Sequence, residues 1–428
     1  MKKIAFHTLG CKLNFSETSD ISRSFQSNGF EVVGFSEDAD YYVINSCSVT
    51  RKAEKKCKSL IKQIIKRNPD AYVAVIGCFS QINPDEISQI PGVGLVLGNA
   101  EKFNLFEYLK ADKDSSQVAK PKKPEYKDLK DFVPTYSKDG RTRSFFKIQD
   151  GCDYMCAYCT IPLARGRSRS DTIEETIKIA EKIAETDIKE MVLSGVNIGD
   201  FGKSHGQNFY GLLKELVKLK DLERIRISSI EPDLLSDEII ELVAEEKNLM
   251  PHFHIPLQSG SDEVLKDMGR RYDTALFKSR IDKIRSIMPD ACIAADLIVG
   301  FPTETDKLFE DTLSFIRECD VSYVHIFTYS ERDNTRAVIS PVSISKEVRS
   351  HRSRQMHALS DEKLKEFYRK NIGKKAFVLW EKENADGFMY GFTENYVKAK
   401  TAYNSKLANE ISEVKLQTID QEGVFIVL

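Results

Sequence analysis

The chain has 428 residues, of which 41% are hydrophobic and 10% aromatic, and its 63 Lys+Arg and 65 Asp+Glu leave a formal net charge of −2. This length predicts about two to three domains, and the composition excludes a mostly disordered chain and a uniformly basic nucleic-acid binder. Apolar runs stay well below the ~18 residues of a membrane span, residues 1–7 turn polar too early for a secretory signal, and the nine cysteines are an odd number. We therefore expect a cytoplasmic protein with reduced thiols and no membrane association.

Residues 1–110 alternate short apolar runs with amphipathic stretches, which predicts an α/β domain with a parallel sheet. The apolar runs are Lys3–Leu9, Tyr41–Asn45, Tyr72–Gly77 and Gly94–Leu97. Residues 111–140 are rich in Lys, Asp, Pro and Ser and predict a linker.

The alternation resumes with a longer period over residues 141–340. The strand candidates are Arg143–Ile148, Glu190–Gly195, Arg224–Ile230, His252–Leu257, Ala291–Gly300 and Tyr323–Tyr329. A helix fits each gap, so the pattern suits either a doubly wound sheet or an incomplete β/α barrel. Both folds collect their ligands at the carboxyl ends of the strands.

The last part of the chain changes character twice. Residues 341–371 carry a long helical pattern and are expected to connect to residues 372–428, where the runs are short and β-like. These runs are Ala376–Trp380, Tyr396–Lys400, Val414–Thr418 and Gly423–Val427. A tail of this kind predicts a small antiparallel barrel.

Three cysteines lie within eight residues of one loop, directly after the first strand of the 141–340 region: Cys152, Cys156 and Cys159. Three thiolates can hold three corners of an iron–sulfur cluster and leave the fourth iron open. The alternatives are a zinc loop that borrows a distant ligand and three unrelated thiols. The C-x3-C-x2-C spacing favours the cluster, because it is the signature of the radical S-adenosylmethionine (SAM) enzymes.

A second set of cysteines is more dispersed. Cys11, Cys47 and Cys78 each follow a predicted strand of the first domain, where side chains from parallel strands converge. They could hold a second cluster with an open iron, or they could be ordinary buried cysteines. We expect the other three, Cys57, Cys292 and Cys319, to pack in the core.

With both sets in view, the chain resembles the radical SAM methylthiotransferases along almost its whole length. The segments that carry the resemblance, besides the loop at 151–160, are Thr8–Asn14, Asn45–Thr50, Ile76–Cys78, Thr160–Gly166, His254–Ser261, Asp296–Pro302 and Tyr329-Ser330. The tail resembles the small RNA-binding barrel called TRAM. The implied fold is an N-terminal α/β domain, a partial (β/α)6 barrel and this C-terminal barrel.

The resemblance also implies the reaction. Two [4Fe-4S] clusters would be held by the two cysteine sets, and a 2-methylthio group would be placed on an adenine. One SAM would donate the methyl group and another would be the source of a 5′-deoxyadenosyl radical. The residues expected at SAM are Tyr158, Gly195, Asn197, Glu231, Gln258 and Asp296.

Within this family, Gly10–Asn14 (Gly-Cys-Lys-Leu-Asn) is most similar to the branch that acts on N6-threonylcarbamoyladenosine next to the tRNA anticodon. The implied partners are a tRNA anticodon stem-loop, an electron donor such as a flavodoxin or ferredoxin, and a sulfur donor that the resemblance does not name. An isopentenyladenosine tRNA or a ribosomal protein is the alternative substrate. A zinc-containing RNA-binding module is the non-enzymatic alternative.

RNA binding requires positive charge despite the net −2. Two segments supply it: Arg51–Arg67 holds eight Lys/Arg against one acid, and Lys346–Lys375 holds ten against four. Weaker candidates for contacts to RNA are Arg165, Arg167, Arg332, Arg336, Lys374 and Lys375. Arg165 and Arg167 could instead neutralise the SAM carboxylate or simply be solvated, and Arg332 and Arg336 are the candidates for a substrate carboxylate.

Overall fold

The computed structural model describes residues 1–111, 129–138 and 142–427, so most of the predicted linker lies outside the described residues. The chain forms two compact units. Unit 1 comprises residues 1–137, 145–171 and 332–338, and unit 2 comprises residues 138–144, 172–331 and 339–428. Across the described residues, no helix is both long and apolar enough to cross a membrane.

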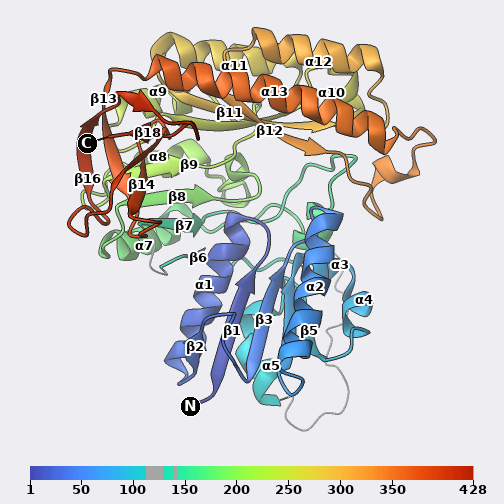
Figure 1. Ribbon diagram of the computed structural model, residues 1–428. Coiled ribbons are helices and arrows are strands. Elements are labelled where there is room, and N and C mark those ends of the chain that lie inside the picture. Colours follow the sequence, from blue (N-terminus) through green and yellow to red (C-terminus); the bar gives the residue numbers. More distant parts are fainter. Residues whose placement is uncertain (112–128, 139–141, 428) are drawn as a thin grey trace. The chain divides into compact units, whose positions relative to one another are not determined.

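Unit 1 is built on a parallel sheet of five strands in the order β2-β1-β3-β4-β5 (Figure 1). The strands are β1 Lys3–Thr8, β2 Glu31–Val33, β3 Tyr41–Ser46, β4 Tyr72–Gly77 and β5 Val93–Leu97. The four apolar runs of the sequence coincide with β1, β3, β4 and β5, which confirms the predicted parallel α/β architecture. The short β2 is only half-buried and lacks the apolar run that would have revealed it.

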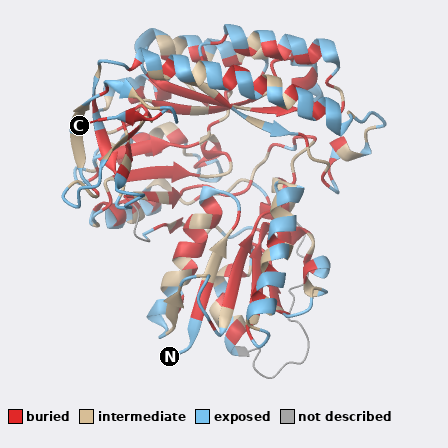
Figure 2. Cartoon of the chain, in the orientation of Figure 1, coloured by how far each residue is buried: buried red, intermediate tan, exposed pale blue. Residues whose placement is uncertain are grey.

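Helices cover this sheet: α1 Lys12–Ser27, α2 Arg51–Arg67, α3 Cys78–Ile82, α4 Pro84–Ser88 and α5 Leu105–Ala111, which follows the 3-10 turn Lys102–Asn104. Thr50 caps α2 by accepting a hydrogen bond from the Ala53 backbone N–H. Cys57, Ile61 and Ile64 line the buried face of α2, and its basic residues point elsewhere. Side chains are buried on both faces of β3, β4 and β5, which explains why these strands are mostly apolar (Figure 2).

The cysteine loop belongs to the same unit. β6 Thr135–Tyr136 pairs antiparallel with the end of β7 Arg143–Lys147, the loop follows, and the short helix α6 Ile161–Arg165 closes it. Asp150 and Arg169 exchange backbone hydrogen bonds and so form the neck of the loop.

Unit 2 contains a βα series whose paired strands are parallel. β8 Glu190–Ser194 pairs with β9 Arg224–Ile227, and β11 Cys292–Val299 lies between β10 His252–Gln258 and β12 Tyr323–Thr328. Single bridges join the β9 region to the β10 region. The helices are α7 Ile173–Ala184, α8 Phe209–Leu216, α9 Asp237–Glu245, α10 Asp262–Met268, α11 Thr274–Ile287 and α12 Asp306–Glu318, and short 3-10 turns lie at Ile198–Asp200 and Lys203–His205. A further 3-10 turn, Arg336–Ile339, begins in the 332–338 segment of unit 1.

The C-terminal part of unit 2 begins with the long helix α13 Lys346–Lys370. A curled six-stranded sheet follows, in the order β16-β13-β14-β15-β18-β17 (Figure 1). Its strands are β13 Lys375–Trp380, β14 Phe388–Phe392, β15 Lys398–Ala402, β16 Ile411–Lys415, β17 Thr418–Ile419 and β18 Phe425–Ile426. The expected purely antiparallel arrangement needs one correction, because β15 and β18 run parallel. Tyr396 has φ +65° and lies in a turn, so β15 begins later than the sequence pattern predicts.

Candidate functional site

Cys11, Cys47 and Cys78 lie just beyond the carboxyl ends of three adjacent parallel strands, β1, β3 and β4. The register aligns these ends, because Thr8 pairs with Asn45 and Ser46 pairs with Gly77. Gly10 has φ +99°, and a Cβ there would lie 2.9 Å from the sulfur of Cys47. The glycine therefore allows the Cys11 segment to lie directly against Cys47.

The three thiols are close enough to influence one another electrostatically. Burial raises the pKa of Cys47 to about 12, and the thiols of Cys78 and Cys11 add to this shift. Cys78 is buried as well, and its sulfur accepts a hydrogen bond of 3.5 Å from Nδ2 of Asn99. Negative charge on Cys47 is unfavourable unless a cation compensates it, which is the situation of a thiolate that binds a metal group.

The loop with Cys152, Cys156 and Cys159 is held by backbone contacts. The backbone N–H of Cys152 donates to the carbonyl of Gly166, and Cys159 donates to Cys156. Two backbone N–H groups point at sulfur: Tyr154 donates to Cys152 and Ile161 donates to Cys159, each at 3.4 Å. Such donors stabilise thiolates, and the donor sets of both trios therefore fit iron–sulfur ligation.

A segment from far along the chain completes this loop. The Ala337 backbone N–H donates to the carbonyl of Ala157 at 2.8 Å, and the Arg336 side chain donates to the carbonyl of Met155 at 2.7 Å. Arg332 is ion-paired with Glu54, and only 7% of its side chain is exposed. Its guanidinium is thus already engaged inside unit 1.

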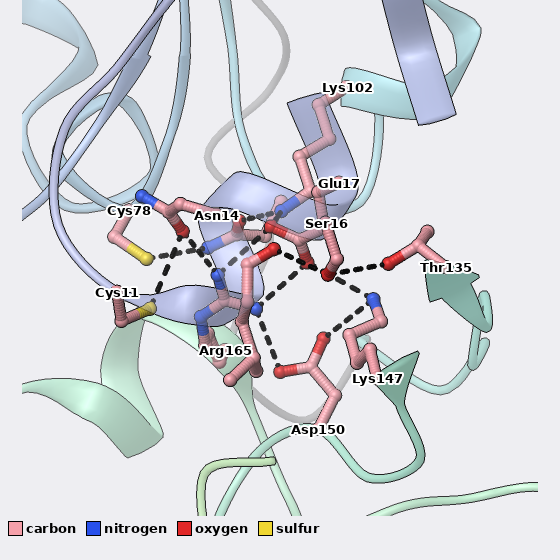
Figure 3. Close-up of polar contacts among 12 residues, drawn as sticks. Cys11, Asn14, Ser16, Glu17, Cys78, Lys102, Thr135, Lys147, Asp150 and Arg165 are labelled. Atoms are coloured by element: carbon pink, nitrogen blue, oxygen red, sulfur yellow. Dashed lines mark hydrogen bonds and ion pairs between the residues drawn. The ribbon is translucent and has the colours of Figure 1, made fainter. Parts of the chain in front are cut away.

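A cluster of mostly buried charged and amide side chains connects the segments that carry the two trios; we call it the Glu17 network (Figure 3). Its members are Asn14, Glu17, Asn99, Lys102, Lys147, Asp150, Arg165 and Arg169. Burial opposes ionisation of Glu17, but Arg165, Lys102 and Lys147 together hold its pKa well below the usual range. We expected Arg165 at RNA phosphate or the SAM carboxylate, whereas its side chain is 1% exposed and lies within this network.

The expected SAM residues are distributed over both units. Tyr158 lies in the cysteine loop of unit 1. In unit 2, Gly195 and Asn197 follow β8, and Asn197 donates to Asp200 at 3.1 Å. Glu231 follows β9 and is ion-paired with Arg270. Gln258 ends β10 with φ +68°, and Asp296 lies in β11.

A cluster of possible ligand atoms that the sequence pattern did not predict lies beside Asp296. Nε2 of His254 lies 2.7 Å from Oδ1 of Asp296, and His325 brings all three ligand atoms within 4.8 Å of one another. The signal was present in the sequence, because His254, Asp296 and His325 lie on strands that pair side by side. Only the register, in which Asp296 faces His325, shows that they meet.

The remaining basic candidates differ in exposure. Arg167 is exposed and lies 3.6 Å from Asp153. Lys374 pairs with Asp290, and Lys375 pairs with Glu413. The basic segment of α13 is smaller than its composition indicates, because Arg349 and Arg352 are buried and paired with acids.

Comparison with protein families gives two matches. A model described as "Radical SAM superfamily" matches residues 146–316, and one described as "Uncharacterized protein family UPF0004" matches residues 3–98. The two matches therefore include both cysteine trios.

Curated relatives match over nearly the full length. The chain is 38% identical to "Threonylcarbamoyladenosine tRNA methylthiotransferase MtaB" of Bacillus subtilis (strain 168), covering 97% of this chain and 94% of that protein. It is 36% identical to the protein of the same name in Aquifex aeolicus (strain VF5), covering 93% and 96%. It is 32% identical to "tRNA-2-methylthio-N(6)-dimethylallyladenosine synthase" of Bacillus subtilis (strain 168), covering 99% and 86%.

Among solved structures, the radical S-adenosylmethionine methyltransferase TsrM from Kitasatospora setae is similar with a TM-score of 0.58. The match covers 79% of this chain and 77% of that chain at 16% identity. At this identity the likeness concerns the fold.

Proposed function

The chain belongs to the tRNA methylthiotransferases of the radical SAM superfamily, and from this premise we propose that it methylthiolates carbon 2 of N6-threonylcarbamoyladenosine next to the tRNA anticodon. The higher identity to the threonylcarbamoyladenosine enzymes, 38% and 36% against 32%, supports this branch. The Gly-Cys-Lys-Leu-Asn segment at residues 10–14 supports it as well. The isopentenyladenosine and ribosomal-protein substrates are the competing outcomes.

The observation that carries the proposal is the gathering of six cysteines in unit 1 as two trios. Radical SAM enzymes use SAM and a [4Fe-4S] cluster, and we assign that cluster to Cys152, Cys156 and Cys159. We assign a second [4Fe-4S] cluster to Cys11, Cys47 and Cys78. When bound, the clusters and SAM supply the electron-transfer, methyl-transfer and sulfur chemistry, which protein side chains alone lack.

The chain's own residues bind and shield these groups. The backbone N–H groups of Tyr154 and Ile161 stabilise negative charge on the sulfurs of the loop, and Asn99 does so at Cys78. Burial of Cys47 and Cys78 shields two of the three proposed ligands of the second site from water, and Cys11 is exposed. We propose that Tyr158 and the unit 2 residues Gly195, Asn197, Glu231, Gln258 and Asp296 contact SAM.

For the tRNA, we propose that the exposed basic face of α2 and the C-terminal sheet contribute to binding. The exposed lysines of α2 include Lys55, Lys62 and Lys66, which can contact phosphate. We propose that residues 372–428 act as a TRAM-like RNA-binding domain. We also propose that the chain has an α/β domain at residues 1–110, a partial barrel domain at residues 141–340 and a helical connector at residues 341–371. An electron donor such as a flavodoxin or ferredoxin would act with the enzyme.

Anaerobic reconstitution followed by iron and sulfide analysis tests the two-cluster assignment. We expect about eight iron atoms and as much sulfide per chain, since each cluster holds about four. Cys156→Ala should lower the iron to about half and abolish SAM cleavage, and Cys78→Ala should lower the iron equally but abolish only methylthiolation.

Cys57→Ala is the matched control, because Cys57 is buried in the core on α2. This variant should keep the full iron content. Zinc without sulfide in the unaltered chain would instead favour the RNA-binding module, and SAM cleavage by Cys156→Ala would overturn the assignment of the loop.

A further inference from the structure

Arg165 ends α6, six residues after Cys159 in the sequence. Its guanidinium reaches two segments that each carry a cysteine (Figure 3). It donates to Oδ1 of Asn14 at 2.6 Å, to Oε1 of Glu17 at 3.0 Å and to Oδ1 of Asp150 at 2.9 Å. Asn14 and Glu17 lie on α1 just after Cys11, and Asp150 lies two residues before Cys152. One planar side chain therefore joins the Cys11 segment to the neck of the cysteine loop.

The same network reaches Cys78. Asn99 donates to the sulfur of Cys78 at 3.5 Å and to the carbonyl of Ala164 at 2.8 Å. Lys102 donates to Asn99 at 2.7 Å and to Glu17 at 2.6 Å. Cys78 is thus tied both to the residue that precedes Arg165 and to the carboxylate that Arg165 binds.

The charges of the network do not cancel. Its ionisable side chains are four bases, Lys102, Lys147, Arg165 and Arg169, and two acids, Glu17 and Asp150. Lys102, Lys147 and Arg165 are each only 1% exposed, so water does little to compensate the excess. Thiolates could compensate this excess, because two of the cysteines contact the network: the sulfur of Cys78 accepts from Asn99 at 3.5 Å, and that of Cys11 lies 4.0 Å from Oδ1 of Asn14.

We propose that Arg165 is a positioning residue that joins the two cysteine segments. Its buried positive charge stabilises the negative charge that a cluster on Cys11, Cys47 and Cys78 gains when the cluster is reduced. The inference rests on the proposed function, because it assumes that this trio holds a cluster. Reduction adds negative charge to the cluster, and a buried cation stabilises that charge more than an exposed one does. Glu17 opposes the effect with a negative charge in the same network.

The test uses the full chain with Cys152, Cys156 and Cys159 replaced by alanine, so that one cluster remains to be titrated by electron paramagnetic resonance. In this background, Arg165→Gln removes one positive charge, and Glu17→Gln removes one negative charge with little change in shape. Arg167→Gln is the matched control, because Arg167 is 62% exposed and its charge is screened by water.

We expect Arg165→Gln to disfavour reduction at least tenfold, a shift of about 59 mV to lower potential. Glu17→Gln should shift the potential upward, and Arg167→Gln should leave it unchanged. A purely structural role predicts loss of iron in both network variants without opposite shifts. If the Arg165→Gln protein binds no cluster, the Glu17→Gln protein alone tests the proposal: an upward shift of its potential supports the electrostatic role, and an unchanged or lower potential overturns it.

The outcomes distinguish a wrong role for Arg165 from a wrong proposed function. A bound cluster whose potential does not move, or moves the same way in both variants, overturns the role of Arg165 and leaves the proposed function standing. A background chain that binds no iron and sulfide overturns the second cluster, and the inference falls with it.

Discussion

Gly151 shows how a single backbone position shapes the cysteine loop. It has φ +70°, and a Cβ there would lie 2.0 Å from the carbonyl oxygen of Arg167, which is backbone and has little room to move. We expect Gly151→Ala to displace the loop, to lower the iron content after reconstitution to about half, and to destabilise unit 1 by about 1–3 kcal/mol.

Gly206 provides the control for this change. It also has positive φ, at +66°, but a Cβ there would meet nothing within 4 Å. Gly206→Ala should therefore show a small loss of stability and no loss of iron. Equal iron content in the Gly151→Ala protein and the unaltered chain would show that the loop tolerates the side chain.

The carboxyl group of Glu17 is expected to make the stability of the apo-protein depend on pH. Its three cationic partners hold its folded-state pKa well below the ordinary value of 4.5, and Arg165 and Lys147 likewise lower the pKa of Asp150. A depressed carboxyl pKa stabilises the fold above the unfolded value, and the stabilisation is lost as pH falls below about 4.5. The protection factors of the α1 amides, which correct hydrogen exchange for its intrinsic pH dependence, should fall steeply below that pH, and much less steeply in Glu17→Gln.

The hydrogen-exchange measurement is needed because the single tryptophan, Trp380, lies in unit 2. An equal pH slope in Glu17→Gln and the unaltered chain would contradict the role assigned to the carboxylate.

At the scale of elements, β9 holds the C-terminal sheet of unit 2 in place. Arg226 makes a two-pronged ion pair with Glu190 at 2.9 Å and donates to the carbonyl of Glu394, and Arg224 donates to the carbonyls of Phe377 and Phe392. Arg226→Met removes both short contacts of the buried Glu190 and leaves it only the longer ion pair to Arg224, at 3.9 Å, so it should destabilise unit 2 by about 3 kcal/mol.

Urea unfolding followed by Trp380 fluorescence measures this change, since Trp380 is buried in the core of that sheet. Lys189→Met is the control, because the Lys189–Glu223 pair is partly exposed and contributes less than about 1 kcal/mol. A similar decrease in the free energy of unfolding in both variants would show that the buried Arg226–Glu190 pair stabilises unit 2 no more than the partly exposed Lys189–Glu223 pair does.

The elements were predictable where burial left a clear pattern. β1, β3, β4 and β5 are apolar because both faces of their sheet are covered, and α2 shows its buried face through Cys57, Ile61 and Ile64. β14 was missed because Phe388–Phe392 has one weak alternation and a glycine, Gly391, that lies against Trp380. Short strands of this kind depend on their neighbours more than on their own residues.

At the scale of the whole molecule, the cysteines could be found from the sequence and their surroundings could not. Strand ends and spacing pointed to both trios, and their roles as ligands are our proposal. The Glu17 network joins Asn14 to Arg165 and Glu17 to Lys147, residues more than a hundred positions apart. A charged residue is expected at the surface when its partners are not known, and a surface arginine suggests contact with RNA phosphate. The sequence alone therefore does not indicate that Arg165 is buried.

The central claim concerns the modified nucleoside, and mass spectrometry of digested tRNA tests it most directly. The chain would be expressed in a bacterial strain that lacks its own methylthiotransferases, with the Cys156→Ala chain expressed in parallel. We predict that 2-methylthio-N6-threonylcarbamoyladenosine appears with the unaltered chain and is absent with Cys156→Ala. The appearance of 2-methylthio-isopentenyladenosine in its place, or of unmodified N6-threonylcarbamoyladenosine alone, would contradict the account.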